Sequence, residues 1–380
     1  MKDPLKLISP SYISDFKCIG GTCEDSCCIG WDIEIDKQTY KDYRKSKNPD
    51  LKPLISENVY RNKSSYSKEV DYGKIAIREN RWCPFLDNKK LCKIQSSIGE
   101  DSLSNVCYTF PRNYNILNGI CELSFYMSCP EAVRKLLAYN EPIEFIESEF
   151  NVKRFIINSE ICTTDKTWKN SPIRNLAELR FRSIEIMQDR TLSLGNRLIK
   201  LGLEMEKLSG KEASSVSEPS FSANHLDLLI YTIESLGLIG EDDSLVFTRY
   251  THLVLDSFPE SSLNEFLATV ERVLRPFIDK NSHLFEHFLV NMIFQENFPF
   301  SVNENSFDGY VMLILRYTLI LFYLTGIAAK NGEITFEDVV SMIQVHTKII
   351  NHHKSFSYNI LQEIKRKGFD SMSFLSGVIL

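Results

Sequence analysis

The chain has 380 residues, of which 43% are apolar and 25% charged, enough for one large or two ordinary domains with buried cores. This composition excludes a disordered tail, and a net charge of -6 argues against nucleic-acid binding driven by bulk charge. Residues 1–134 contain 20 Lys and Arg against 18 Asp and Glu, so their net charge is +2 and that of the remainder is -8. The sequence therefore indicates two differently built halves.

The first residues, Met-Lys-Asp-Pro-Leu-Lys, contain no apolar stretch long enough for a secretory signal. We therefore expect a cytoplasmic protein, whose thiols stay reduced.

The N-terminal part is predicted to be irregular, with a few short strands. Apolar and acidic residues alternate over 31–36, which predicts a short strand, and Asp36 is placed to cap a helix that follows. Residues 48–71 are polar and predict a variable loop or short helices, whereas 74–78 predict a second strand. We expect a cysteine-rich module over residues 1–134.

Beyond Pro130 the pattern becomes helical. Residues 131–137 predict a helix, and apolar residues three and four apart over 174–208 predict one or two more. A Ser-rich stretch at 209–224 predicts a linker or loop. Later helices are predicted at 226–238, 261–273, 283–295, 308–330, 336–351 and 355–364. The fold class expected is mainly α, with the cysteine-rich module docked on a larger helical domain over 135–380.

One apolar stretch, residues 310–329, has the length of a membrane-spanning helix. Arg316 lies near its middle and would cost about 2.5 to 3.5 kcal/mol to insert. We therefore expect a buried helix of a soluble core and no membrane insertion.

Nine of the ten cysteines lie within 112 residues, which in a long cytoplasmic chain points to metal thiolates rather than disulfides. Close spacing lets the first four sulfurs converge from one loop, in which glycines permit tight turns. A cysteine followed by proline, as at 129–130, often occurs at iron-sulfur ligands. The predicted ligands are Cys18, Cys23, Cys27, Cys28, Cys83, Cys92, Cys107 and Cys129.

These spacings leave the metal open. Four of the thiolates would suit zinc as well as an iron-sulfur cluster. Cys162 is expected to be an inert thiol, and Cys121 is as consistent with an inert thiol as with a ligand.

The cysteine pattern resembles that of a known family. Residues 16–36 and 39–40, Cys83-Pro-Phe-Leu, 91–94, 107–112 and 123–131 follow in order the pattern of the flagellin lysine-N-methylases. The cysteine portion is also similar to the CxxCxxxCC domains that chelate zinc or iron, although four residues separate Cys18 from Cys23 here. Residues 285–300 resemble a helical element of the same methylases. The resemblance covers nearly the whole chain, most strongly before residue 132.

This resemblance implies methyl transfer from S-adenosylmethionine to lysine ε-amines of flagellin, with a [4Fe-4S] cluster required. The amine must lose its proton before it attacks the methyl group, so a base or a desolvating site is needed. Asp32 and Tyr126 are the candidate catalytic residues, and Glu24 and Asp36 are further acidic side chains near the cysteine loop.

The methyl-donor site is less well marked. No Gly-x-Gly-x-x-Gly loop follows a strand, so a Rossmann-type nucleotide site has no support. A cluster with an open iron could chelate the donor, but Gly30 stands where a Cys-x3-Cys-x2-Cys motif would need its third cysteine. A structural cluster remains an equal alternative. Gly20, Gly21 and Arg112 are the candidate cofactor-binding residues.

The sequence also permits two competing interpretations. His283-Leu-Phe-Glu-His287 matches a zinc-protease pattern, but the surrounding Phe and Leu residues favour a packing helix. A non-enzymatic metal-binding module with a helical partner-binding domain is the alternative to the methylase.

Overall fold

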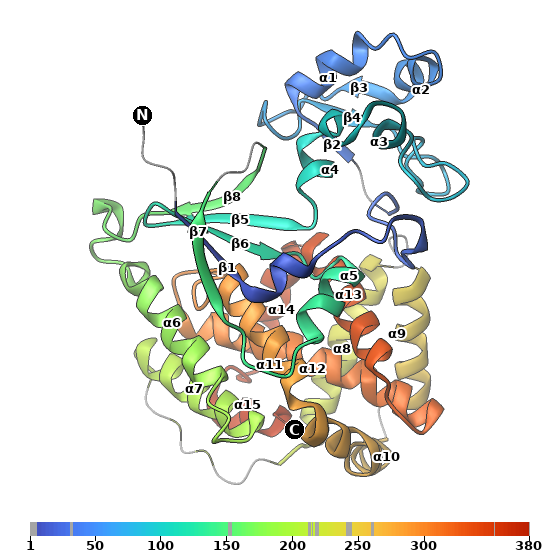
Figure 1. Cartoon of the computed structure of the whole chain (residues 1–380). Helices are drawn as coiled ribbons and strands as arrows, with labels where there is room; N and C mark the ends of the chain where they lie inside the picture. The colour runs from blue at the N-terminus through green and yellow to red at the C-terminus, as the bar shows by residue number, and fades with distance from the viewer. Residues whose placement is uncertain are drawn as a thin grey trace. The chain divides into compact units, whose positions relative to one another are not determined.

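The computed structural model describes all residues except 1–5, 31–32, 151–153, 212–213, 215, 217–219, 241–244, 260–261, 353 and 380. The chain divides into two compact units, both visible in Figure 1. The first comprises Met1–Ala132 and Phe145–Ile161, and the second comprises Val133–Glu144 and Cys162–Leu380. Each unit is described by itself.

A five-stranded mixed sheet forms one part of the first unit (Figure 1). In sheet order its strands are β7 (Phe145–Glu149), β1 (Lys6–Pro10), β6 (Ile120–Phe125), β5 (Arg112–Leu117) and β8 (Ile157–Ile161). The pairs β1–β6 and β5–β8 are parallel, and the other two neighbouring pairs are antiparallel. Strands that are far apart in the sequence, such as β1 and β6, are therefore neighbours in the sheet.

The central hairpin of this sheet turns at Asn118 and Gly119. Both residues have positive φ, 53° and 79°, as a two-residue hairpin turn with right-handed strand twist requires. The turn sets the register in which Leu117 pairs with Ile120 and Arg112 with Phe125.

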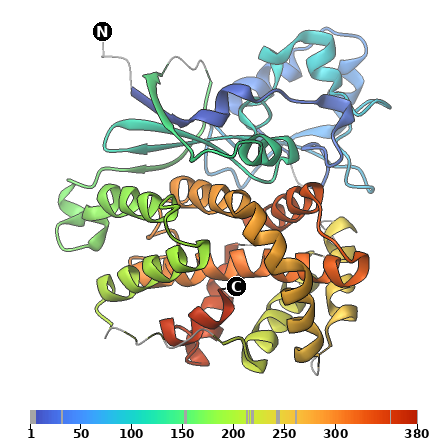
Figure 2. The same ribbon diagram turned by 60° about the horizontal axis from the view of Figure 1, so that its bottom comes forward.

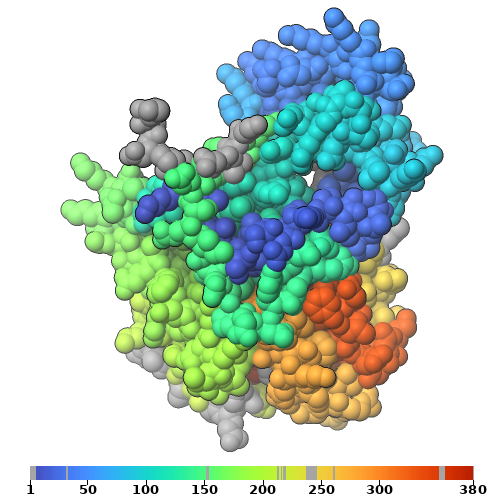
Figure 3. All heavy atoms as spheres, viewed as in Figure 1, coloured from blue at the N-terminus to red at the C-terminus, as the bar shows by residue number. Residues whose placement is uncertain are grey.

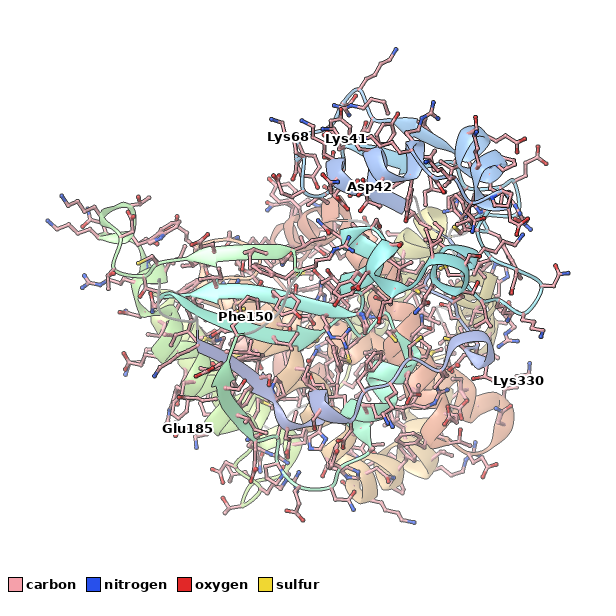
Figure 4. The ribbon with its side chains drawn as sticks, turned by 45° about the horizontal axis from the view of Figure 1, so that its top comes forward. Lys41, Asp42, Lys68, Phe150, Glu185 and Lys330 are labelled. Atoms are coloured by element: carbon pink, nitrogen blue, oxygen red, sulfur yellow. The ribbon has the colours of Figure 1, made fainter. Side chains whose placement is uncertain are left out.

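One face of the sheet carries a small apolar core, made by Leu7, Tyr114, Cys121 and Leu123. Phe150, labelled in Figure 4, packs against it, with its ring centroid 5.8 Å from that of Tyr114. Cys121 is therefore a core residue of the sheet.

A second, three-stranded sheet has its own core. Its antiparallel strands, in order, are β2 (Ile33–Ile35), β4 (Gly73–Ile75) and β3 (Val59–Arg61). Helices α1 (Lys37–Arg44), α2 (Leu51–Asn58), α3 (Lys93–Ile98) and α4 (Asn105–Thr109) accompany it. The buried side chains include Ile35, Leu51, Ile75, Phe85 and Cys83.

The predicted start of the first helix is confirmed. An Asp36 carboxylate oxygen accepts a hydrogen bond from the backbone N–H of Thr39, and the other accepts from that of Asn105. Asp36 is 4% exposed, so its carboxylate acts as a helix cap and as a link between two segments.

The regular elements in the described part of the second unit are all helices, and they are best followed in Figure 2. Helix α5 (Pro130–Leu137) leads into it. The longer helices that follow are α6 (Leu176–Met187), α7 (Leu194–Leu208), α8 (Ala223–Gly240), α9 (Leu245–Ser257), α11 (Arg275–Gln295), α12 (Ser306–Asn331), α13 (Phe336–His352) and α14 (Lys354–Arg366). The short ones are α10 (Leu263–Thr269), continued by a π-helical turn at Val270–Leu274, and α15 (Met372–Leu375).

Helix α12 is the centre of the helical unit and packs against α7, α9, α13 and α14. It is the one described helix long and apolar enough to cross a membrane, but 94% of its most apolar window is buried inside the protein. Arg316 forms an ion pair with Glu296, which compensates its charge. The expectation of a buried core helix is confirmed.

The mainly helical fold with a cysteine-rich, strand-containing N-terminal part is confirmed. Helix α9 and the five-stranded sheet were not predicted. Between α7 and α8, the described residues of 209–222 belong to no helix or strand, and the predicted linker or loop at 209–224 stays a prediction. The boundary proposed at 134/135 stays a prediction, and residues 145–161 belong to the first unit.

Candidate metal centre

The first cysteine loop is fixed to the segment around Cys83 by backbone hydrogen bonds. The N–H of Cys83 donates to the carbonyl of Cys28 at 2.9 Å, and that of Gly30 donates to the carbonyl of Arg81 at 3.0 Å. Cysteines that are 55 residues apart in the sequence are thereby brought together.

Gly20 and Gly21 shape the same loop. Gly20 has a φ of +58°, a conformation that side chains rarely adopt. A Cβ atom on Gly21 would collide with the carbonyl oxygen of Lys89. The close approach of this loop to residues 89–91 therefore requires glycine at both positions. The cofactor-binding role predicted for the two glycines stays a prediction.

Three further predicted ligands lie in or beside short elements. Cys92 is the N-cap residue of α3, and its backbone forms an isolated antiparallel β-bridge with that of Leu86. Cys107 lies in α4, where its N–H donates to the hydroxyl of the capping Ser104. The N–H of Cys129 donates to the carbonyl of Tyr126 at 3.2 Å, at the turn that follows β6.

Six thiols form one electrostatic group, with Cys27 as the common neighbour. A negative charge on Cys27 raises the pKa of four others, and Cys83 is influenced in the same way by two of these four. The group consists of Cys23, Cys27, Cys83, Cys92, Cys107 and Cys129. The structure therefore brings together cysteines from all three sequence segments that were predicted to supply ligands.

The other four cysteines differ in their surroundings. Cys28 packs against the core of the small sheet, and the exposed sulfur of Cys18 accepts a hydrogen bond from the N–H of Gly20 at 3.4 Å. Cys121 belongs to the other core, and Cys162 is exposed, with its sulfur 3.3 Å from the hydroxyl of Thr164.

Burial dominates the protonation of the grouped thiols. It raises the pKa of Cys83, Cys107 and Cys129 to about 12 and that of Cys23 to about 11. These groups are therefore neutral thiols at physiological pH. Because metals bind thiolates, loading such a site would release protons, and the metal charge would offset the cost of burying the anions.

The donor set fits a thiolate-bound metal or cluster by its chemistry, since soft sulfur ligands suit both zinc and iron-sulfur centres. Its side chains lie farther apart than the ligands of a single metal ion do. Within the ranges that the structure describes, no three His, Cys, Asp or Glu side chains lie close enough to bind one metal ion.

The candidate catalytic and binding side chains have different surroundings where the structure describes them. Tyr126 is half-buried and lies three residues before Cys129. The guanidinium of Arg112 stands over the ring of Phe16, 5.8 Å from its centroid. Glu24 is exposed beside Cys23, and Asp32 lies outside the described residues.

The histidine pair of α11 is a packing element, as the sequence favoured. The His287 ring nitrogens contact the carbonyl oxygens of Leu136 and Glu141, at 3.1 and 2.9 Å. Glu286 is fully buried and pairs with Arg190 and Arg197. These contacts occupy two of the three groups that a zinc protease would use, His287 and Glu286.

An open pocket of about 450 Å³ at the start of α12 had no sequence signal. Asp308 and Lys365 line it and form an ion pair of 2.6 Å, so their charges compensate each other. Asn305, also in its wall, caps α12 by accepting from the N–H groups of Phe307 and Asp308.

Comparison with known proteins gives the family. Residues 180–378 match the FliB lysine N-methylase C-terminal domain. The lysine-N-methylases of Salmonella typhimurium and Salmonella choleraesuis are each 22% identical over 95% of this chain and 96% of their own length. The flagellar biosynthetic protein FliU of Salmonella muenchen is 32% identical over 36% of this chain and 79% of its own length.

No solved structure matches the chain significantly. The domain match covers more than half of the chain and lies within the helical unit, whereas the two full-length relatives span the cysteine-rich unit as well. By these matches the chain belongs to the FliB lysine N-methylase family.

Proposed function

We propose that this protein methylates lysine side chains of flagellin in the cytoplasm, with S-adenosylmethionine as the methyl donor. The observation that carries the proposal is the match over 95% of the chain to a lysine-N-methylase, together with the likeness to a flagellar biosynthetic protein. This activity requires a protein substrate with accessible lysines. It also requires a methyl donor that carries a sulfonium group.

The reaction sets simple requirements. The lone pair of a neutral lysine ε-nitrogen forms a bond to the methyl carbon, and the electron pair of the breaking C–S bond goes to sulfur. The methylated nitrogen is now positively charged, and it becomes neutral by releasing one proton. A protein group must accept a proton from the ammonium form or exclude water around it. Tyr126 and Asp32 are the residues we propose for that task.

We further propose that the cysteines of the first unit hold a [4Fe-4S] cluster, with zinc as the alternative. The ligands would come from Cys18, Cys23, Cys27, Cys28, Cys83, Cys92, Cys107 and Cys129. Support comes from the electrostatic group around Cys27, whose six members are all thiols. When bound, such a cluster would cross-link the cysteine segments and offer an iron that can bind the amino and carboxylate groups of the methyl donor.

The test is a methylation assay with protein purified under anaerobic conditions. We expect label from methyl-labelled S-adenosylmethionine on flagellin lysines and none on flagellin whose lysines were first acetylated. Iron and acid-labile sulfide should co-purify. Unlabelled flagellin would refute the methylase proposal, and stoichiometric zinc without sulfide would refute the cluster.

Tyr126→Phe tests the proton acceptor separately. If the phenol takes the proton, the variant loses kcat and its kcat shows a changed pH profile, while the KM for flagellin is preserved. Unchanged kcat and pH dependence would remove Tyr126 from the mechanism.

A further inference from the structure

The five-stranded sheet ends in strand β7, and within the described residues no strand pairs with its outer side. Its pairing partner is β1, and in the described part of the chain the backbone of residues 146–149 takes part in no other strand pairing. Four of its five residues are exposed. In the space-filling view of Figure 3, the green segment that contains β7 lies on the visible surface. An open edge of this kind presents backbone donors and acceptors to a further strand.

The side chains of β7 give this edge a definite charge. Side chains alternate along a strand, so Glu147 and Glu149 share one face, and Ile146 and Ser148 share the other. Both glutamates are exposed, and no ion pair among the described residues involves either of them. The edge therefore combines two available carboxylates with an exposed apolar side chain, Ile146, which is 48% exposed.

The inner side of β7 shows which residue suits these carboxylates. In the antiparallel pairing with β1, Lys6 stands directly opposite Glu149. Residues at such positions have Cβ atoms about 4.5 to 5.5 Å apart, and opposite charges there stabilise the pairing. A lysine on a strand added to the outer side of β7 would take the equivalent position.

The opposite edge of the same sheet is less suited. Strand β8 carries one carboxylate, Glu160, and three of its five residues are partly buried. Pro and Lys, which proteins commonly use to block exposed edges, are absent from both edge strands. The acidic pair therefore distinguishes the two edges.

We propose that the open edge of β7 is a docking site for an extended, lysine-bearing segment of the protein substrate, which pairs with β7 as an added strand. This inference rests on the proposed function for the identity of that substrate. Backbone hydrogen bonds supply sequence-independent affinity, and Glu147 and Glu149 select lysines at alternate positions. A second copy of this chain is a poorer occupant, because two β7 strands would bring four carboxylates together.

The binding test needs no methylation. Its probe is a synthetic peptide with alternating Thr and Lys, measured by calorimetry against wild type, Glu147→Lys, Glu149→Lys and the double variant. Glu160→Lys on the opposite edge is the matched control. We expect the double variant to bind at least about tenfold more weakly, since each opposite-charge pair becomes a like-charge pair, and the control to bind as wild type does.

A peptide with acetylated lysines should bind weakly to all variants. Equal affinity of wild type and double variant, or equal binding of the acetylated peptide, would overturn the inference. A wild-type dimer that the double variant abolishes would also overturn it, by assigning the edge to a second copy. Circular dichroism of each variant verifies that the sheet is intact.

The catalytic arm separates the two proposals. With flagellin as substrate, we expect the double variant to raise KM by about tenfold and to leave kcat unchanged, with a weaker dependence of KM on salt. Methylation by wild type with an unchanged KM in the double variant refutes the docking site alone. Absence of methylation by wild type refutes the proposed function, while the peptide measurement still decides the docking site.

Discussion

The buried carboxylate of Glu286 offers a quantitative test of the helical unit. It accepts from Arg197 at 2.6 Å and from Arg190 at 2.9 Å, and the Glu286 and Arg197 side chains are only 1% and 3% exposed. The Nε atom of Arg197 has no hydrogen-bond partner in the described structure. In Glu286→Gln, the two guanidinium charges would lose their counter-charge, and Arg197 would remain buried.

Breaking a buried ion pair on one side costs about 3 to 5 kcal/mol, and we expect a loss in this range because Arg197 cannot reach water. The control is Glu271→Gln. Glu271 pairs with Arg275 one helical turn away, where the side chains are 60% and 45% exposed. An exposed pair of this kind contributes about 0.3 to 0.5 kcal/mol.

Urea unfolding followed by circular dichroism at the helix signal measures both variants. The expected result is a large fall in the midpoint for Glu286→Gln at an unchanged slope, against a small one for Glu271→Gln. Equal losses below about 1 kcal/mol in the two variants would refute the assignment of Glu286 as a buried charge centre.

Three further predictions follow from the cysteine loop and the helical core. Cys27→Ser should lower the bound iron and sulfide more than Cys162→Ser, because Cys27 is the common neighbour of the thiol group and Cys162 is an exposed thiol that does not belong to this group; equal contents would contradict this. Gly21→Ala should lower metal content and thermal stability, because the added Cβ meets the carbonyl of Lys89, whereas a stable variant with full metal content would show that the loop can shift. Burial lowers the pKa of His346 to about 3, so the unfolded chain binds a proton that the folded chain does not, and stability should fall as pH drops from about 6.5 toward 3 by up to about 1.4 kcal/mol per pH unit. His346→Phe should flatten that part of the pH dependence in thermal unfolding, and an unchanged slope would contradict the prediction.

Local signals predicted the helices well and the large sheet poorly. Asp36 caps a helix because its side chain needs only neighbours along the chain, and such information is present in a short window. The five-stranded sheet joins β1 to β6 and β7, more than 100 residues away, and no local pattern specifies those pairings. The Asn-Gly pair at 118–119 is a local signal for the central hairpin of this sheet, because both turn positions need positive φ.

The candidate metal centre shows the same division. The number and spacing of the cysteines predict a set of ligands, because ligand chemistry depends on residue identity, and that set stays a prediction. The approach of Cys28 to Cys83 depends on backbone hydrogen bonds between two loops, which spacing does not encode. The pairing of Glu147 and Glu149 on an open edge likewise became visible only when β7 was placed at the end of the sheet.

The position of α12 has a consequence for synthesis of the protein. Two of the helices that surround it, α7 and α9, precede it in the chain, but α13 and α14 follow it. While the ribosome is still translating these later helices, an apolar segment of 26 residues in the nascent chain lacks part of its cover. Such a segment resembles a membrane anchor to targeting factors, so we expect the newly made chain to depend on chaperones until α14 has emerged.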